Sequence, residues 1–312
     1  MKKSFSLTLI LIVSLYAKGQ VNNDTLTLKS FDYLFNSCQL AKDNLLKDTY
    51  ANAIVKKAKR ENDTISLIGG YSFKSELSEG IDHLAYQDSI IFITKSNGNK
   101  YQPSIAYLTK GFYYYNKGDY VNALENAMKS RSYAKKYINK DLELRSNHYV
   151  GVFKTKLGNY EEALTIFKDN LNYYNSIEIN PHDFDMLKLN SIHSIALKYN
   201  DLNELDPTYY YNKIGYAKSL EINDVKFENF FRLNEGVSLY KQAKYNSAID
   251  SLEKTIDVLV NTEDYPSIAK GNFYLAKSFE KQLNSKKAIS YYKKVDSIFR
   301  FTYYIDKHLR ES

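Results

Sequence analysis

The 312-residue sequence has one cysteine, four prolines, twelve glycines and no tryptophan. A single cysteine excludes an intramolecular disulfide framework and any zinc site built on cysteine ligands. So few prolines and glycines argue against a turn-rich all-β protein, because these residues form most tight turns. The sequence is rich in lysine, leucine, alanine and glutamate, which favour helices. We therefore expect a helical protein.

Long apolar runs and blocks of one charge are missing as well. The net charge is +7, but acidic and basic residues alternate along the chain, so nothing indicates nucleic-acid binding. The longest apolar run follows Lys2 and Lys3 and extends over Phe5–Leu15, which is short for a membrane span. Ala17-Lys18-Gly19 then places small residues where a signal peptidase cleaves. We predict a signal peptide over 1–19, a short tail over 20–30, and an exported protein, periplasmic or secreted.

Two segments repeat at a spacing of forty residues, one starting at Gly111 and one at Gly151, and weaker copies start at Gly236 and Ala276. The shared positions are Gly111, Gly118, Tyr120 and Ala123; Gly151, Gly158, Tyr160 and Ala163; Gly236 and Ala248; and Ala276 and Ala288. Small residues let two helices cross closely. Gly118 and Gly158 can take the left-handed conformation that ends a helix. Each helical hairpin has an apolar back that only another hairpin can cover, so the hairpins must stack.

This pattern resembles the tetratricopeptide repeat. The resemblance implies an all-α fold, a right-handed α-solenoid of stacked helical hairpins over 31–312. The repeats are clearest over 104–174 and 229–299 and degenerate over 63–96 and 189–220, where we expect a longer turn at Asn200–Pro207. We expect Tyr120 and Tyr160 to fill the wedge between paired helices.

Three phrases, at Tyr107–Tyr120, Lys156–Lys168 and Tyr291–Phe299, resemble the periplasmic sensor half of Bacteroidetes regulators. Members of that family carry tetratricopeptide repeats, a membrane helix and a cytoplasmic helix-turn-helix domain of the AraC or LuxR kind. This sequence stops before a membrane helix and a DNA-binding domain. The chain is then either a fragment or truncated paralogue of such a regulator, or a free periplasmic module. We expect His308 to begin another repeat.

The last residues also suggest an uncovered apolar end, formed by Ile298, Phe299, Tyr303 and Ile305. A solenoid normally finishes with a polar capping helix, and none is evident here. We expect this end surface to be capable of self-association.

The first helix of each repeat lines the concave groove in tetratricopeptide repeat proteins. The groove positions map onto Tyr115, Asn116, Arg145, His148, Lys156, Asn190, His193, Asn200, Phe230, Tyr240, Lys241, Lys270, Phe273 and Lys277. Cations pair with carboxylates, and aromatic rings pack against apolar side chains. This set fits an extended peptide with some negative charge. A solvated face without a ligand is the alternative.

No pattern indicates catalysis. The sequence lacks a glycine-rich phosphate loop and the HExxH and GxSxG motifs. His148 and His193 could approach each other, but no third metal ligand is near in the sequence, and Cys38 lacks a positioned histidine. We expect no enzyme activity, no metal and no cofactor. The favoured function is a protein or peptide interaction module that senses a partner for a signalling regulator; the alternative is a structural scaffold or assembly subunit.

Overall fold

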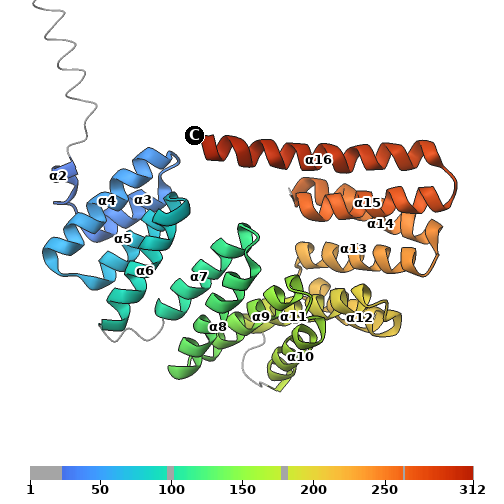
Figure 1. Ribbon diagram of the computed structural model, residues 1–312, viewed down its shortest axis with the longest axis horizontal. Coiled ribbons are helices and arrows are strands. Elements are labelled where there is room, and N and C mark those ends of the chain that lie inside the picture. Colours follow the sequence, from blue (N-terminus) through green and yellow to red (C-terminus); the bar gives the residue numbers. More distant parts are fainter. Residues whose placement is uncertain (1–22, 97–101, 177–181, 263, 312) are drawn as a thin grey trace, which may run out of the picture. The chain divides into compact units, whose positions relative to one another are not determined.

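The computed structural model describes residues 23–96, 102–176, 182–262 and 264–311, and every regular element in these ranges is a helix (Figure 1). The all-α fold of stacked helical hairpins is therefore confirmed. The proposed signal peptide and its cleavage site lie outside the described residues. None of the described helices is both long and apolar enough to cross a membrane.

The helices follow one another along the described ranges. They are α2 (Asn23–Leu26), α3 (Phe31–Leu40), α4 (Asn44–Glu61), α5 (Thr64–Leu77), α6 (Gly80–Ser96), α7 (Gln102–Asn116), α8 (Tyr120–Lys136), α9 (Lys140–Lys156), α10 (Tyr160–Ser176), α11 (His182–Asp201), α12 (Leu205–Glu221), α13 (Val225–Lys241), α14 (Tyr245–Leu259), the 3-10 turn η1 (Val260–Thr262), α15 (Tyr265–Lys281) and α16 (Ser285–Glu311). The chain divides into two compact units, Met1–Ser146 and Asn147–Ser312, and α9 runs across the division.

A three-residue turn with one left-handed residue joins seven pairs of consecutive helices in the described ranges. After α7, Gly118 has a φ of 78°, and the amide of Asp119 donates to the carbonyl of Tyr114 at 2.9 Å. The side chain of Asp119 then accepts a hydrogen bond from the amide of Asn122 at 3.1 Å, which caps α8. One residue thus closes one helix and begins the next.

The left-handed position is not reserved for glycine. It is occupied by Gly118, Ile138, Gly158, Asn203, Asn223, Ala243 and Leu283. Helices α8, α9, α10, α12, α13 and α15 have 17 residues each. A helix of this length and a three-residue turn together span 20 residues. The left-handed position therefore recurs every 20 residues, which is half of the forty-residue repeat found in the sequence.

The small residues of the repeat lie where helices cross. A Cβ added at Gly151 would lie 2.6 Å from the ring of Phe167, and one added at Gly236 would lie 2.6 Å from Leu252. The repeat alanines Ala123, Ala163, Ala248, Ala276 and Ala288 are all buried, as is Gly111. The large side chain of one helix therefore occupies the space that the small residue of its partner leaves open.

Each unit buries its own apolar clusters between consecutive helices. In the first unit, Leu26 of α2 packs with Leu34 and Ile54, so part of the segment expected to be a tail belongs to the core. In the second unit, one cluster joins α10, α11 and α13 around Phe167, Ile195 and Phe231. Another joins α13 to α16 around residues that include Leu252, Leu275 and Phe279.

Several boundaries differ from those expected. The longer turn expected at Asn200–Pro207 is wrong: α11 continues to Asp201 and α12 already begins at Leu205, with Pro207 in its first turn. A proline is tolerated there because its missing N–H would have no partner inside the helix. The expectation that His308 begins another repeat is also wrong, since α16 is continuous and extends past the end of α15 (Figure 1).

The two other expectations about packing gave mixed outcomes. Tyr120 is half-buried and its ring lies tilted against that of Tyr115 at a distance of 5.7 Å, whereas Tyr160 remains 42% exposed. At the C-terminal end, Ile298 packs on the core, and Phe299 is 62% exposed. The side chains of Tyr303 and Ile305 lie outside the described part of the chain.

The left-handed turns predict that a substitution to glycine at such a position stabilises the protein. Leu283 has a φ of 61° and a side chain that is 91% exposed, so replacing it loses little packing. We expect Leu283→Gly to raise the free energy of unfolding by about 1 kcal/mol, because glycine avoids the cost of this conformation. Urea unfolding measures the change.

Gly158→Ala is the matched control. Its φ is 83° and nothing lies within 4 Å of an added Cβ, so only the backbone conformation penalises alanine. We expect Gly158→Ala to destabilise by a similar amount. A Leu283→Gly variant no more stable than the unmodified protein contradicts the argument.

Candidate functional site

The first helices of successive hairpins in the second unit form one continuous face. Helix α13 contacts both α11 and α15. In a stack of hairpins, the helices that contact one another across repeats line the inner side. We call the exposed side of α11, α13 and α15 the inner face of the second unit.

Aromatic and cationic side chains alternate on this face. The Nζ atom of Lys277 lies 5.2 Å from the ring centre of Phe273 and 5.8 Å from that of Tyr240, within cation–π range. Tyr240 also meets Tyr274 edge-on at 5.4 Å. Phe273 remains 39% exposed, so an apolar surface next to a cation is open to a partner.

Three lysines of the inner helices interact electrostatically with Asp201, which ends α11, or pair with it. We call Lys198, Lys241 and Lys270 the lysine cluster. Lys198 is paired with Asp201 at 2.5 Å, and the ammonium of Lys241 donates to the main-chain carbonyl of Asn200. Lys270 interacts electrostatically with Asp201 and with both other lysines.

The cluster is held in an environment that disfavours its charges. Burial lowers the pKa of Lys270; the carboxylate of Asp201 opposes this effect, while the charges of Lys241 and Lys198 add to it. Burial also lowers the pKa of Lys241, again opposed by Asp201. Desolvation disfavours an ammonium group, and neighbouring cations disfavour it further. The cluster therefore favours the neutral form of Lys270 and Lys241 more than water does.

Buried asparagines tie the helices beneath the lysine cluster together. The side-chain amide of Asn200 donates to Oδ1 of Asn234 at 2.5 Å and to its main-chain carbonyl at 3.1 Å. The amide of Asn234 donates in turn to Oδ1 of Asn212 at 2.9 Å. This chain of hydrogen bonds links α11, α13 and α12, and it fixes their relative positions because an unpaired buried amide would be costly.

The two histidines expected in the groove are packing residues. His193 stacks on Phe230 at 5.0 Å and meets Phe231 edge-on at 5.6 Å. Burial lowers its pKa to about 3, helped by the charge of Lys270 and by His148. Burial likewise lowers the pKa of His148 to about 4. Within the described ranges, no group of three His, Cys, Asp or Glu residues could hold a metal ion.

Other residues expected in the groove lie apart from the lysine cluster. Asn190 donates within α11 to the carbonyl of Met186 at 2.9 Å, and Lys156 is exposed at the end of α9. In the first unit, Arg145 pairs with Asp141 at 2.8 Å, and Tyr115 and Asn116 lie at the end of α7. Nine residues of the expected set belong to the three inner helices: Asn190, His193, Asn200, Phe230, Tyr240, Lys241, Lys270, Phe273 and Lys277.

Sequence reasoning missed Lys198, Asp201 and Tyr274. They fall outside the groove positions of the repeat pattern, so the pattern alone could not select them. One signal was available: Tyr274 follows Lys270 by one helical turn, which places both on one side of α15.

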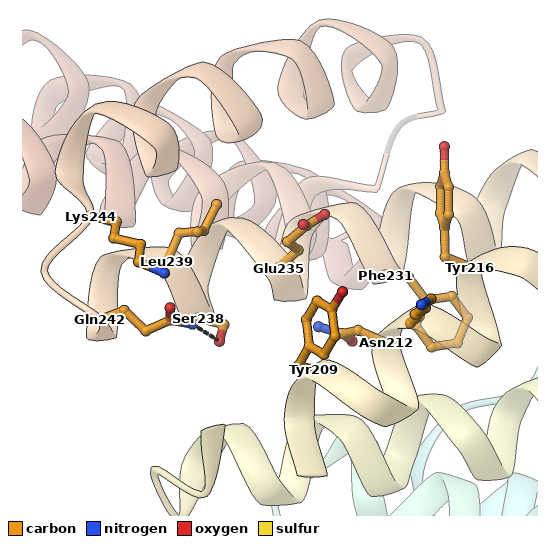
Figure 2. A pocket seen from close by; sticks show the side chains of 10 residues that line it. Tyr209, Asn212, Tyr216, Phe231, Glu235, Ser238, Leu239, Gln242 and Lys244 are labelled. Atoms are coloured by element: carbon orange, nitrogen blue, oxygen red, sulfur yellow. Dashed lines mark hydrogen bonds between the residues drawn. The ribbon is translucent and has the colours of Figure 1, made fainter. Parts of the chain in front are cut away.

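A separate pocket lies between α12 and α13, with a volume of about 360 Å³ (Figure 2). Figure 2 shows Tyr209 and Asn212 of α12 on one side and Glu235 and Leu239 of α13 on the other. Its walls are mainly apolar, and its rim is formed by Gln242 and Lys244 of the following turn. Asn212 lines this pocket and accepts a hydrogen bond from Asn234 of α13. It therefore connects the pocket to the asparagine hydrogen bonds of the inner helices.

Solved structures resemble this chain in fold. A Signal Transduction ATPase with Numerous Domains from Pyrococcus horikoshii, with a tetratricopeptide repeat sensor, has a TM-score of 0.62 at 17% identity over 91% of this chain. A Rap protein complexed with competence and sporulation factor has a TM-score of 0.58 at 15% identity, covering 86% of this chain and 79% of its own. Aspartyl phosphate phosphatase F from Bacillus subtilis has a TM-score of 0.54 at 16% identity over 86% of this chain.

The chain has a tetratricopeptide-like repeat fold. It spans 63% of the length of the phosphatase and 45% of that of the ATPase. No protein-family model and no curated protein matches the sequence. At this level of identity, the likeness establishes the architecture of the tetratricopeptide-like repeats and leaves the activity to be argued from the residues.

The buried histidines predict loss of stability in acid. In the unfolded chain His193 takes up a proton with a pKa near 6.5, whereas in the folded chain it stays neutral until about pH 3. Below pH 6.5 the unfolded state therefore binds more protons, and the free energy of unfolding falls by up to about 1.4 kcal/mol per pH unit for each such histidine.

We expect His193→Phe to remove part of this pH dependence, because phenylalanine keeps the aromatic packing and cannot be protonated. Urea unfolding at pH 7 and pH 4.5 measures the difference for both proteins. An equal loss of stability in the variant and the unmodified protein shows that His193 does not titrate as described.

Proposed function

We propose that this chain is a protein- or peptide-binding module whose partner lies on the inner face of the second unit. The observation that carries the proposal is the arrangement of Phe273, Lys277 and Tyr240, where an exposed ring adjoins a cation held between two aromatic groups. Such a surface packs apolar side chains and pairs with acidic ones. A stack of helices offers this chemistry along an extended line, which suits a peptide.

The proposal includes a role in signalling. One structural relative carries a tetratricopeptide repeat sensor, and another was solved as a complex with competence and sporulation factor. These relatives support a module that recognises a protein or peptide and passes the event to another domain or protein. We propose the same division of labour here, with this chain as the sensing portion of a regulator.

We propose binding without catalysis. Cys38 is buried, and burial raises the pKa of its thiol to about 11, so little thiolate is present at neutral pH. His193, on the inner helix α11, is held neutral in aromatic surroundings. The groups that gather on this face are suited to holding a partner and do not form a nucleophile paired with a base.

The binding surface is tested with a displayed library of random octapeptides selected on the full chain. We expect the double variant Phe273→Ala/Lys277→Ala to bind the selected peptides at least about tenfold more weakly, because both the apolar contact and the cation are removed. Tyr210→Ala is the matched control, since Tyr210 is 58% exposed on α12, away from the three inner helices. Equal affinity of the double variant and the control contradicts the assignment.

Export is also part of the proposal, and it rests on the basic start, apolar run and Ala17-Lys18-Gly19 of the sequence. The periplasm or the exterior is where we expect the product. Intact mass and N-terminal sequencing of the native protein test this expectation. A product beginning at Gln20 supports export with cleavage; a cytoplasmic product that retains Met1 contradicts it.

A further inference from the structure

We propose that the pocket between α12 and α13 binds a small zwitterion with an apolar body, of the class of the aromatic and large aliphatic amino acids. The pocket has a volume of about 360 Å³, near the lower end of the range of about 300–1,000 Å³ that is typical of ligand sites. Phe273, Lys277 and Tyr240 do not line it, so this inference goes beyond the proposed partner-binding function and does not depend on it.

Aromatic side chains form a fixed apolar wall of the pocket. Phe231 is 1% exposed and packs on Gly215, where an added Cβ would displace its ring. The ring of Tyr216 is held in place because its phenolic oxygen accepts a hydrogen bond from the guanidinium of Arg232 at 2.7 Å. Tyr209 lines the pocket as well. Apolar surface that is already in place takes up an aromatic ring or a branched side chain without the cost of ordering the site.

Two buried polar side chains line the pocket and have donors that the protein does not use. Asn212 is 7% exposed and Ser238 is 5% exposed. Oδ1 of Asn212 accepts a hydrogen bond from Asn234 at 2.9 Å, whereas its own amide nitrogen donates to no acceptor in the described part of the chain. Oγ of Ser238 accepts from Gln242 at 3.3 Å, which leaves its hydroxyl proton to be donated. Buried donors are rarely left unpaired, so an oxygen of a ligand fits here.

The charged residues of the pocket carry both signs. Glu235 precedes Ser238 by three residues on α13, and its carboxylate makes no hydrogen bond or ion pair with another described residue. Lys213 and Lys244 line the pocket from its exposed side. A simple cation would meet the two ammonium groups, and a simple anion would meet Glu235. A zwitterion avoids both conflicts, because its ammonium group pairs with the carboxylate while its own carboxylate pairs with the donors.

The polar and apolar groups are separated along the pocket. Figure 2 shows Phe231 and Tyr216 at one end of the lining side chains and Ser238 and Lys244 at the other, with Glu235 between them. An amino acid whose side chain lies against the rings can therefore direct its ammonium and carboxylate groups toward the polar end. Glycine lacks the apolar contact, and the side chain of aspartate would bring a charge against the rings.

Calorimetric titration of the full chain with free amino acids tests the ligand class. We expect phenylalanine or leucine to bind with a Kd of about 1 mM or lower, and glycine and aspartate at least about tenfold more weakly. Three analogues separate the groups of the ligand. Phenethylamine lacks the carboxylate, 3-phenylpropionate lacks the ammonium group, and N-acetylphenylalanine amide represents a residue inside a peptide chain. Each is expected to bind at least about tenfold more weakly than phenylalanine.

The decisive variant is Glu235→Gln, which keeps the size of an exposed side chain and removes its charge. We expect it to weaken the binding of phenylalanine about tenfold or more, and to leave that of 3-phenylpropionate unchanged or stronger, because this analogue has no ammonium group. A residue that only supports the fold would affect both ligands alike. Asp250→Asn is the matched control: Asp250 is exposed on α14 and does not line the pocket, so neither affinity changes.

A second variant, Ser238→Ala, tests the carboxylate end of the site independently. It removes one donor and adds no volume to the pocket. We expect phenylalanine and 3-phenylpropionate to bind about tenfold more weakly and phenethylamine to bind as before, because only the first two ligands carry a carboxylate.

The outcomes separate this proposal from the binding module on the inner face. If no amino acid binds the unmodified chain at about 10 mM, or if phenylalanine binds equally well after both substitutions, the site is overturned and the module stands. Equal binding of phenylalanine and N-acetylphenylalanine amide overturns the zwitterion as the ligand. Failure of the octapeptide selection, by contrast, removes the module and leaves the pocket to be judged by these titrations.

Discussion

Seven pairs of consecutive helices in the described ranges are joined by only three residues. The left-handed residue at the centre of such a turn makes the reversal possible, because it lets the amide of the next residue donate to the last turn of the preceding helix. At Gly118 the next residue is Asp119, and its side chain also caps the following helix. So short a turn forces consecutive helices to pack as antiparallel neighbours. With helices of 17 residues, every second helix then returns to the same side of the stack.

Because the turns are short, neighbouring helices pack closely against each other. Neighbouring helices are close enough that Gly151 and Gly236 cannot accept a Cβ without displacing Phe167 or Leu252. Rings and branched side chains fill these crossings from one side only. The abundant tyrosines have a second role at the surface, where lysine ammonium groups lie over their rings: Lys198 lies 4.7 Å from the ring centre of Tyr160. In a chain with 43 basic and 36 acidic residues, aromatic faces give cations a partner in addition to the carboxylates.

The regular stacking of helices brings α11, α13 and α15 together on the inner face. Asparagine hydrogen bonds and the stacking of His193 on Phe230 join α11 to α13, and the contact of Tyr240 with Tyr274 joins α13 to α15. Lys241 adds a hydrogen bond from α13 to the main chain of α11. These contacts between helices hold Lys270 in a position where burial lowers the pKa of its ammonium group.

The sequence alone was sufficient for the all-α class, for the forty-residue repeat and for the small residues at the helix crossings, because these depend on local propensity and on spacing along the chain. It predicted wrongly where α12 begins and how far α16 extends, since a left-handed turn at Asn203 and a continuous helix have no distinctive residue pattern. Of the groove positions, it selected Lys241 and Lys270 but also His193, whose ring is packed among aromatic residues. Only the tertiary structure brought Lys198 and Asp201 to Lys270, because proximity, desolvation and charge balance arise between helices and not along one.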